Sequence, residues 1–157
     1  MRTGTIGALT AALAIALAGV AHGKANTARI SISGPGIESE IASSDPELIM
    51  ANAWAGNFAE ASQVASAPDA SLPRHLVKFY IDTGESGMRL VYAVHFVWDP
   101  TARRARVQLP GPGDRWYRLN IGTIIHDGSD GSPLRDGSWY YANEEWARAV
   151  RALLPSG

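Results

Sequence analysis

Alternating apolar and polar residues over 75–109 constrain the fold of this chain more than any other feature. Residues 75–82 (HLVKFYID) and 104–109 (RARVQL) alternate with a period of two, which is typical of half-buried β-strands. Between them, residues 88–98 (MRLVYAVHFVW) are largely apolar on both faces, as expected of a strand in the middle of a sheet. Because short turns separate the three segments, we predict an antiparallel meander.

Two strands and a short helix are predicted before the meander. Residues 28–33 (ARISIS) and 37–41 (IESEI) alternate around a Gly-Pro-Gly turn, which indicates a hairpin. Residues 45–47 (DPE) supply an N-cap, a proline at the first helical position and an acid in the first turn. A helix is therefore expected to begin at Pro46 and to end before Gly56. Residues 57–74 are rich in Ala, Ser and Pro without a usable period and predict a surface loop.

The C-terminal part of the chain is predicted to end in an amphipathic helix. Residues 116–119, 121–125 and 138–142 are interpreted as short strands, and 127–137 as a polar loop. Asn143 can cap the helix, whose apolar positions recur at helical spacing: Trp146, Ala149, Val150, Leu153 and Leu154. The expected fold class is α+β, a twisted antiparallel sheet packed on one face by this helix and by the short helix at 46–55.

A cleavable export signal is predicted at residues 1–25. Arg2 supplies the positive start, residues 6–20 form an apolar run, and small residues follow. Cleavage is possible after Ala21, Gly23 or Ala25, and we favour Ala25. The run is shorter than the ~20 residues of a membrane span, so no span is expected after processing. Residues 26–157 are then expected to form a single globular domain.

The amino-acid composition limits the possible cellular locations of the protein and the possible classes of its binding partner. The chain has no cysteine, so it has neither a disulfide framework nor a lipid-anchoring cysteine. An exported domain without disulfides favours a bacterial origin and a periplasmic, cell-wall-associated or secreted location. Removal of the signal takes two of the 14 basic residues and none of the 15 acidic ones. Without a basic excess, we expect no nucleic-acid partner.

Candidates for catalysis and for metal binding are few. Without cysteine there is no thiol nucleophile, and no HExxH, SxxK, GxSxG or P-loop motif occurs. His95 lies mid-strand and is expected to be a partly buried, hydrogen-bonded histidine, with a catalytic or ligand role as the alternative. His126 beside Asp127 offers a second weak pair for a general base.

A calcium-binding loop is the one metal site that the sequence suggests as a candidate. Asp127, Asp130 and Asp136 lie among Gly and Ser, but the ligand spacing of a calcium loop is not met. We therefore predict no metal site and no cofactor.

Aromatic and basic residues supply the candidate ligand-binding set. Trp116, Tyr117, Trp139, Tyr140 and Tyr141 could stack on a glycan, although adjacent residues of a strand face opposite sides, so part of each cluster should belong to the core. Arg104 and Arg106 could form an anion patch with Lys78 on a solvated sheet face, which would also carry Gln108 and Tyr80.

The leading functional hypothesis is a non-catalytic exported domain that binds an envelope or extracellular partner, either a glycan or a protein. One alternative is a small hydrolase or lyase that uses a histidine with a carboxylate, so whether the chain is an enzyme stays open, with the balance towards no. Another is a structural or accessory envelope protein. A pocket that places a histidine and a carboxylate within hydrogen-bond distance would favour the enzyme, whereas a flat aromatic face would favour binding.

Overall fold

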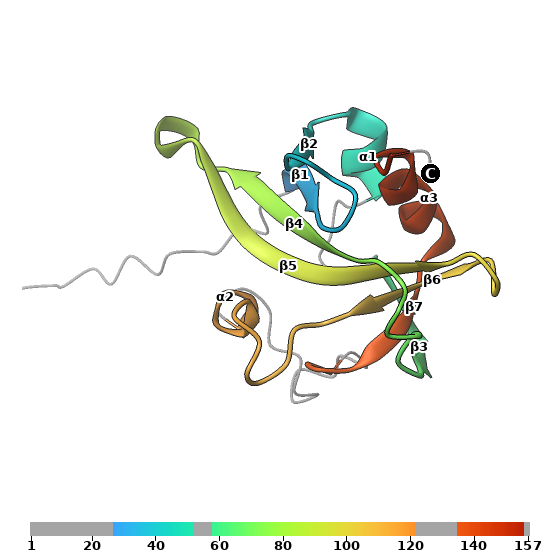
Figure 1. Cartoon of the computed structure of the whole chain (residues 1–157). Helices are drawn as coiled ribbons and strands as arrows, with labels where there is room; N and C mark the ends of the chain where they lie inside the picture. The colour runs from blue at the N-terminus through green and yellow to red at the C-terminus, as the bar shows by residue number, and fades with distance from the viewer. Residues whose placement is uncertain (1–26, 52–57, 122–134, 156–157) are drawn as a thin grey trace, which may run out of the picture.

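The computed structural model describes residues 27–51, 58–121 and 135–155, and its central element is an open antiparallel sheet of seven strands (Figure 1). The order across the sheet is β2-β1-β4-β5-β6-β7-β3. The predicted signal at 1–25 lies outside the described residues. The strands are β1 (Thr27–Ser33), β2 (Ile41–Ser43), β3 (Ala59–Ala65), β4 (Arg74–Asp82), β5 (Met88–Asp99), β6 (Arg104–Gln108) and β7 (Trp139–Ala142).

The predicted meander is confirmed as β4, β5 and β6, which pair in sequence order. The short 3₁₀ turn η1 (Gly84–Ser86) joins β4 to β5. The strand predicted to be apolar on both faces is β5, which has twelve residues and lies at the centre of the strand order. The predicted α+β class is also confirmed, since the described part of the chain adds three α-helices to the sheet: α1 (Pro46–Ala51), α2 (Tyr117–Ile121) and α3 (Glu144–Ala152).

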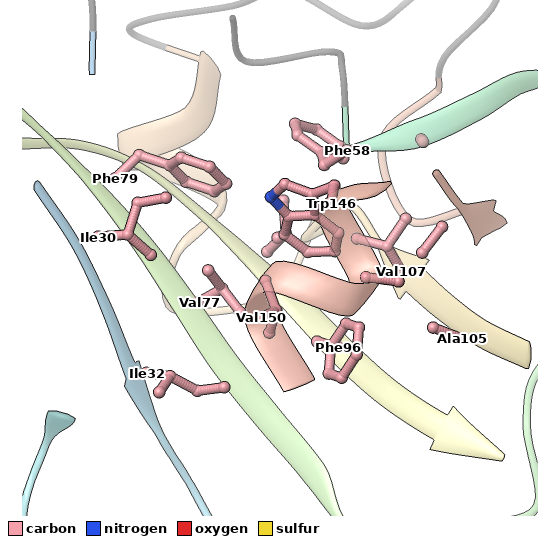
Figure 2. Packing of buried hydrophobic residues seen from close by; sticks show 14 of the residues in the cluster. Ile30, Ile32, Phe58, Val77, Phe79, Phe96, Ala105, Val107, Trp146 and Val150 are labelled. Atoms are coloured by element: carbon pink, nitrogen blue, oxygen red, sulfur yellow. The ribbon is translucent and has the colours of Figure 1, made fainter. Parts of the chain in front are cut away.

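One face of the sheet packs against α1 and α3 and forms the main core. Figure 2 shows Val77 and Phe96 of the sheet around Trp146 and Val150 of α3, and all four side chains are almost completely buried. Phe58, just before β3, lies 5.9 Å from Trp146 between ring centroids. Burial of large side chains on one face of the sheet is the main favourable contribution to the fold.

Capping residues begin both helices of the core where the sequence predicts. Asn143 Oδ1 accepts hydrogen bonds from the backbone N–H groups of Glu145 and Trp146, at 3.0 and 3.2 Å. Asp45 Oδ1 likewise accepts from the N–H of Glu47 at 2.8 Å. These caps satisfy backbone donors that have no partner within the helix. In the part of the chain that the structure describes, no helix has the length and apolar character needed to cross a membrane.

The predicted surface loop at 57–74 is wrong in its first half. Residues 59–65 form β3, which pairs with β7 at the edge of the sheet. Its sequence, AEASQVA, is poor in the β-branched and aromatic residues that mark strands. The register is irregular between Ala59 and Val64, so the alternation that would reveal a regular strand is interrupted.

The predicted strand at 116–119 is also wrong, because the chain turns into α2 there. Asp114 Oδ1 accepts the N–H of Trp116 at 2.8 Å, and the Asp114 carbonyl accepts the N–H of Tyr117 at 3.1 Å. These bonds start a helical turn that the aromatic residues alone do not indicate. The first hairpin pairs as predicted, but its second strand is shifted from 37–41 to Ile41–Ser43. The predicted strand at 121–125 and the loop at 127–137 fall mostly outside the described residues.

Candidate functional site

The register of the sheet aligns a row of side chains on the face opposite the main core. Ser33, Leu76, His95, Gln108 and Trp139 pair in turn across β1, β4, β5, β6 and β7. Directly paired residues of antiparallel strands lie on the same face, so these five form one line across the sheet. We call this side of the sheet the His95 face.

Helix α2 is attached to β5 on this side through one buried amide. Asn120 Oδ1 accepts the N–H of Ala93 at 3.0 Å, and Asn120 Nδ2 donates to the Ala93 carbonyl at 2.7 Å. The register of β5 and β6 would place Pro110 opposite Ala93, and proline has no N–H to donate. Asn120 therefore replaces a strand residue where β6 has ended. Figure 1 shows α2 on the side of β5 away from α1 and α3.

This attachment places the turn before α2 beside His95. His95 Nε2 lies 2.7 Å from Asp114 Oδ2, and the two side chains are 16% and 26% exposed. Burial by itself would raise the pKa of Asp114, but hydrogen bonds from the Trp116 N–H and His95, with the nearby charges of His95 and Arg115, hold that pKa below its usual value. Asp114 is therefore ionised at neutral pH. An ionised Asp114 accepts the Nε2 hydrogen, so Nδ1 is the nitrogen of a neutral His95 that can accept a proton.

A pocket of about 530 Å³ surrounds this pair. Its wall is formed by Ser33 at the end of β1, by Arg74 and Leu76 of β4, and by residues 114–116. The Arg115 guanidinium lies 4.8 Å from the centroid of the Trp116 ring. The lining of the pocket therefore combines a tryptophan, two arginines, a serine and the imidazole–carboxylate pair.

Next to the pocket, Lys78 belongs to a separate polar cluster on the same face. Its Nζ lies 5.5 Å from the centroid of Trp116 and 2.5 Å from Glu40 Oε2. Glu40 also accepts hydrogen bonds from Ser31 and Tyr80. Although burial opposes it, the hydrogen bond and charge of Lys78 hold the pKa of Glu40 below its usual value.

Arg104 and Arg106 of β6 are brought together around Tyr141 of β7, and none of the three lines the pocket. The Arg104 guanidinium lies 3.5 Å from the Tyr141 ring centroid and 2.6 Å from Glu60 Oε2. Arg106 pairs with Asp99 at 3.0 Å. Each cation of the predicted anion patch, Lys78 included, already has a carboxylate partner. We therefore place the candidate site at the His95 pocket.

The predicted aromatic clusters divide between core and surface. In β7, Tyr140 is fully buried in the main core, whereas Trp139 and Tyr141 lie on the His95 face, as strand alternation predicts. Trp139 is only 7% exposed. Trp116 and Tyr117 are both half-buried at the start of α2, and of the five rings Trp116 lines the pocket.

Sequence reasoning selected His95 but missed the residues that surround it. Asp114 lies 19 positions away in a Pro-Gly turn, and nothing in that turn marks a partner for a mid-strand histidine. Arg74 and Arg115 were likewise missed. The weak pair His126 and Asp127 lies outside the described residues. Within 27–51, 58–121 and 135–155, no group of His, Asp and Glu side chains is arranged to hold a metal ion.

Comparison with known proteins gives no match. No protein-family model fits the chain, and no curated protein and no solved structure is significantly similar to it.

Proposed function

We propose that this chain is an exported binding protein whose His95 pocket holds one sugar unit of an envelope or extracellular glycan. The observation that supports the proposal is the half-buried Trp116 indole beside the His95–Asp114 pair, 2.7 Å apart, in one pocket. Sugar rings have apolar faces that stack on aromatic planes, and hydroxyl groups that need fixed donors and acceptors.

The size and chemistry of the pocket agree with a ligand of this kind. Small-molecule sites span ~300–1,000 Å³, and a pocket of about 530 Å³ lies within that range. Ser33 supplies a hydroxyl, Asp114 an acceptor, and Arg74 and Arg115 several donors. The export signal predicted at 1–25 would bring the protein to envelope or extracellular glycans.

Retention of the full-length protein on polysaccharides tests the proposal. Immobilised peptidoglycan, chitin, cellulose and pectin are the probes, compared between the parent and Trp116→Ala. We expect the parent to be retained by at least one of them, and Trp116→Ala to bind about tenfold more weakly, because the stacking surface is lost.

Trp98→Ala is the matched control. Trp98 is also a half-buried tryptophan of this sheet, but it packs against the main core beside Arg151 rather than in the pocket. Retention of the Trp98→Ala protein should equal that of the parent. If no polysaccharide retains the parent and no soluble glycan binds it, the glycan proposal is wrong, and a protein partner or an accessory envelope role becomes the better hypothesis.

The His95–Asp114 pair favours a second candidate function, a hydrolase or lyase acting on the same ligand. Asp114 would orient the imidazole, and His95 Nδ1 would take a proton during the reaction. Mass spectrometry of glycan incubated with the protein separates the two candidates. Hydrolysis adds water across the broken bond, elimination leaves a double bond, and a binding protein leaves the glycan unchanged. Under the enzyme hypothesis, His95→Gln should abolish product formation without abolishing retention.

A further inference from the structure

We propose that the sugar held in the His95 pocket is acidic and that Arg74 binds its oxyanion, a carboxylate or a sulfate. This inference rests on the proposed function, since it names the class of sugar that the same pocket recognises. The observation that supports it is which basic side chains on the His95 face have a carboxylate partner and which do not.

Three cations near the pocket on the His95 face have carboxylate partners, and the two arginines that line the pocket do not. Outside it, Lys78, Arg104 and Arg106 each have a carboxylate oxygen within 3.0 Å or less. Among the described residues, no carboxylate lies within ion-pair distance of Arg74 or Arg115, both of which line the pocket. Arg74 and Arg115 therefore line the pocket without a carboxylate in ion-pair contact, although the charges of Arg115 and Asp114 still interact.

Each oxygen of Asp114, the acid of the pocket, already accepts one hydrogen bond. One Asp114 oxygen faces His95 Nε2 at 2.7 Å, and the other accepts the Trp116 N–H at 2.8 Å. The direct hydrogen-bond partners of Asp114 are thus His95 and the backbone of the turn, and Arg115 acts on it only through its charge. A ligand that brings its own anion would supply the missing partner.

Arg74 has a defined position for this role. Its guanidinium lies 5.0 Å from the centroid of the Trp139 ring, which gives the long side chain a surface to lie against. Guanidinium groups bind carboxylate and sulfate oxygens through two parallel hydrogen bonds, and such charge-assisted bonds are about twice as strong as neutral ones. A neutral sugar cannot make them, so charge should decide which sugars bind.

Calorimetric titration of the full-length protein with matched charged and neutral glycans tests the inference. The probes are oligogalacturonate against its methyl ester, hyaluronan oligosaccharides against their methyl esters, and a sulfated galactan against its desulfated form. We expect at least one charged member to bind about tenfold or more tightly than its neutral partner. That preference should weaken as sodium chloride is raised, because salt screens the ion pair.

Two substitutions locate the preference at Arg74. Arg74→Gln should bring the charged and neutral affinities to within about threefold of each other, and Arg74→Lys should keep part of the difference, because it retains the charge but not the planar fork. Arg74 is exposed, so neither change should affect folding. Arg106→Gln is the control, because Arg106 lies on the same face but pairs with Asp99. The Arg106→Gln protein should prefer charged over neutral glycans as strongly as the parent does.

The outcomes separate this inference from the proposed function. Equal binding of charged and neutral glycans would overturn the acidic-sugar inference and leave glycan binding intact. An unchanged charge preference in Arg74→Gln would overturn the assignment to Arg74. Binding of none of the glycans, charged or neutral, together with no retention on the four polysaccharides, would overturn both proposals. If only the carboxylated glycans bind more tightly than their neutral partners, the oxyanion is a carboxylate. If only the sulfated glycan does, it is a sulfate.

Discussion

At the scale of single residues, Asn120 determines where the pocket forms. Its amide satisfies both backbone groups of Ala93 at the point where Pro110 prevents β6 from continuing. Through this pair of bonds, α2 and the turn that carries Asp114 and Trp116 are fixed against β5. A short helix of five residues has little stability of its own, so its position depends on such tertiary contacts.

Replacement of Asn120 by alanine should therefore destabilise the protein by about 1–3 kcal/mol, because a buried N–H and a buried carbonyl lose their partners. Urea denaturation followed by tryptophan fluorescence measures the change. Arg118→Ala, an exposed substitution in the same helix, should change the free energy of unfolding by no more than about 0.5 kcal/mol. Equal stabilities of the two variants would show that the amide is not what holds α2.

His95 marks how far the candidate site can be predicted from the sequence. Its place in a strand pattern predicts a partly buried, hydrogen-bonded side chain, and the structure confirms that environment. Its partner could not be predicted, because Asp114 reaches it only through the turn that Asn120 fixes. Arg74 begins β4 and Arg115 lies in the turn before α2, so only the folded sheet brings them to one pocket.

At the scale of elements, a strong periodicity of apolar residues was sufficient to predict a strand or helix, and a weak periodicity was not. The segments β4, β6 and α3 have regular apolar patterns that bury one face, β5 is apolar on both faces, and the predictions for all four are confirmed. By contrast, β3 consists largely of small and polar residues, and its strand conformation depends on pairing with β7, far away in sequence. Helix α2 begins through hydrogen bonds to Asp114 rather than through an amphipathic pattern.

Helix α3 lies in the core, and we expect its buried side chains to contribute strongly to the free energy of unfolding. Trp146 is fully buried, with ring centroids 5.6 Å from Phe96 and 5.9 Å from Phe58. We expect Trp146→Ala to cost about 3–5 kcal/mol, the range for large aromatic truncations in cores. Thermal unfolding checks this, with Arg148→Ala on the exposed side of α3 as the control. An unchanged melting temperature in Trp146→Ala would mean that the helix is only loosely attached.

At the scale of the whole molecule, the two faces of the sheet differ in their chemistry. The core face packs fully buried aromatic side chains against α3, while the His95 face carries the ion pairs, the pocket and partly exposed rings such as Tyr141. The meander was predictable because its strands are neighbours in sequence. The pairing of the β1–β2 hairpin with β4, and of β7 and β3 with the β6 edge, was not predictable, because no short turn connects β1 to β4, β6 to β7 or β7 to β3. The pocket lies across β1, β4 and β5, so its location depends on that order.

Buried and paired titratable groups predict that the molecule loses stability in acid in two stages. His75 is 7% exposed, and burial lowers its pKa although the Pro35 carbonyl, 3.1 Å from Nε2, opposes the shift. The unfolded chain therefore binds a proton at this residue more readily than the folded protein. The free energy of unfolding should fall as the pH drops below the usual histidine value of 6.5, by no more than about 1.4 kcal/mol per pH unit for one proton.

The second stage involves carboxylates. The pKa values of Asp114 and Glu40 are held low in the folded protein, so their stabilising contribution is present above the unfolded values of 3.8 and 4.5 and is lost as the pH falls through the lower, folded values. Urea denaturation at a series of pH values should resolve both stages. His75→Gln should flatten the dependence between pH 7.5 and 5.5 and leave the loss below pH 4 in place, because it removes only the imidazole. A parent protein that is equally stable at pH 7.5 and 5.5, or a variant with the same slope as the parent, would show that His75 takes up its proton without cost to the fold.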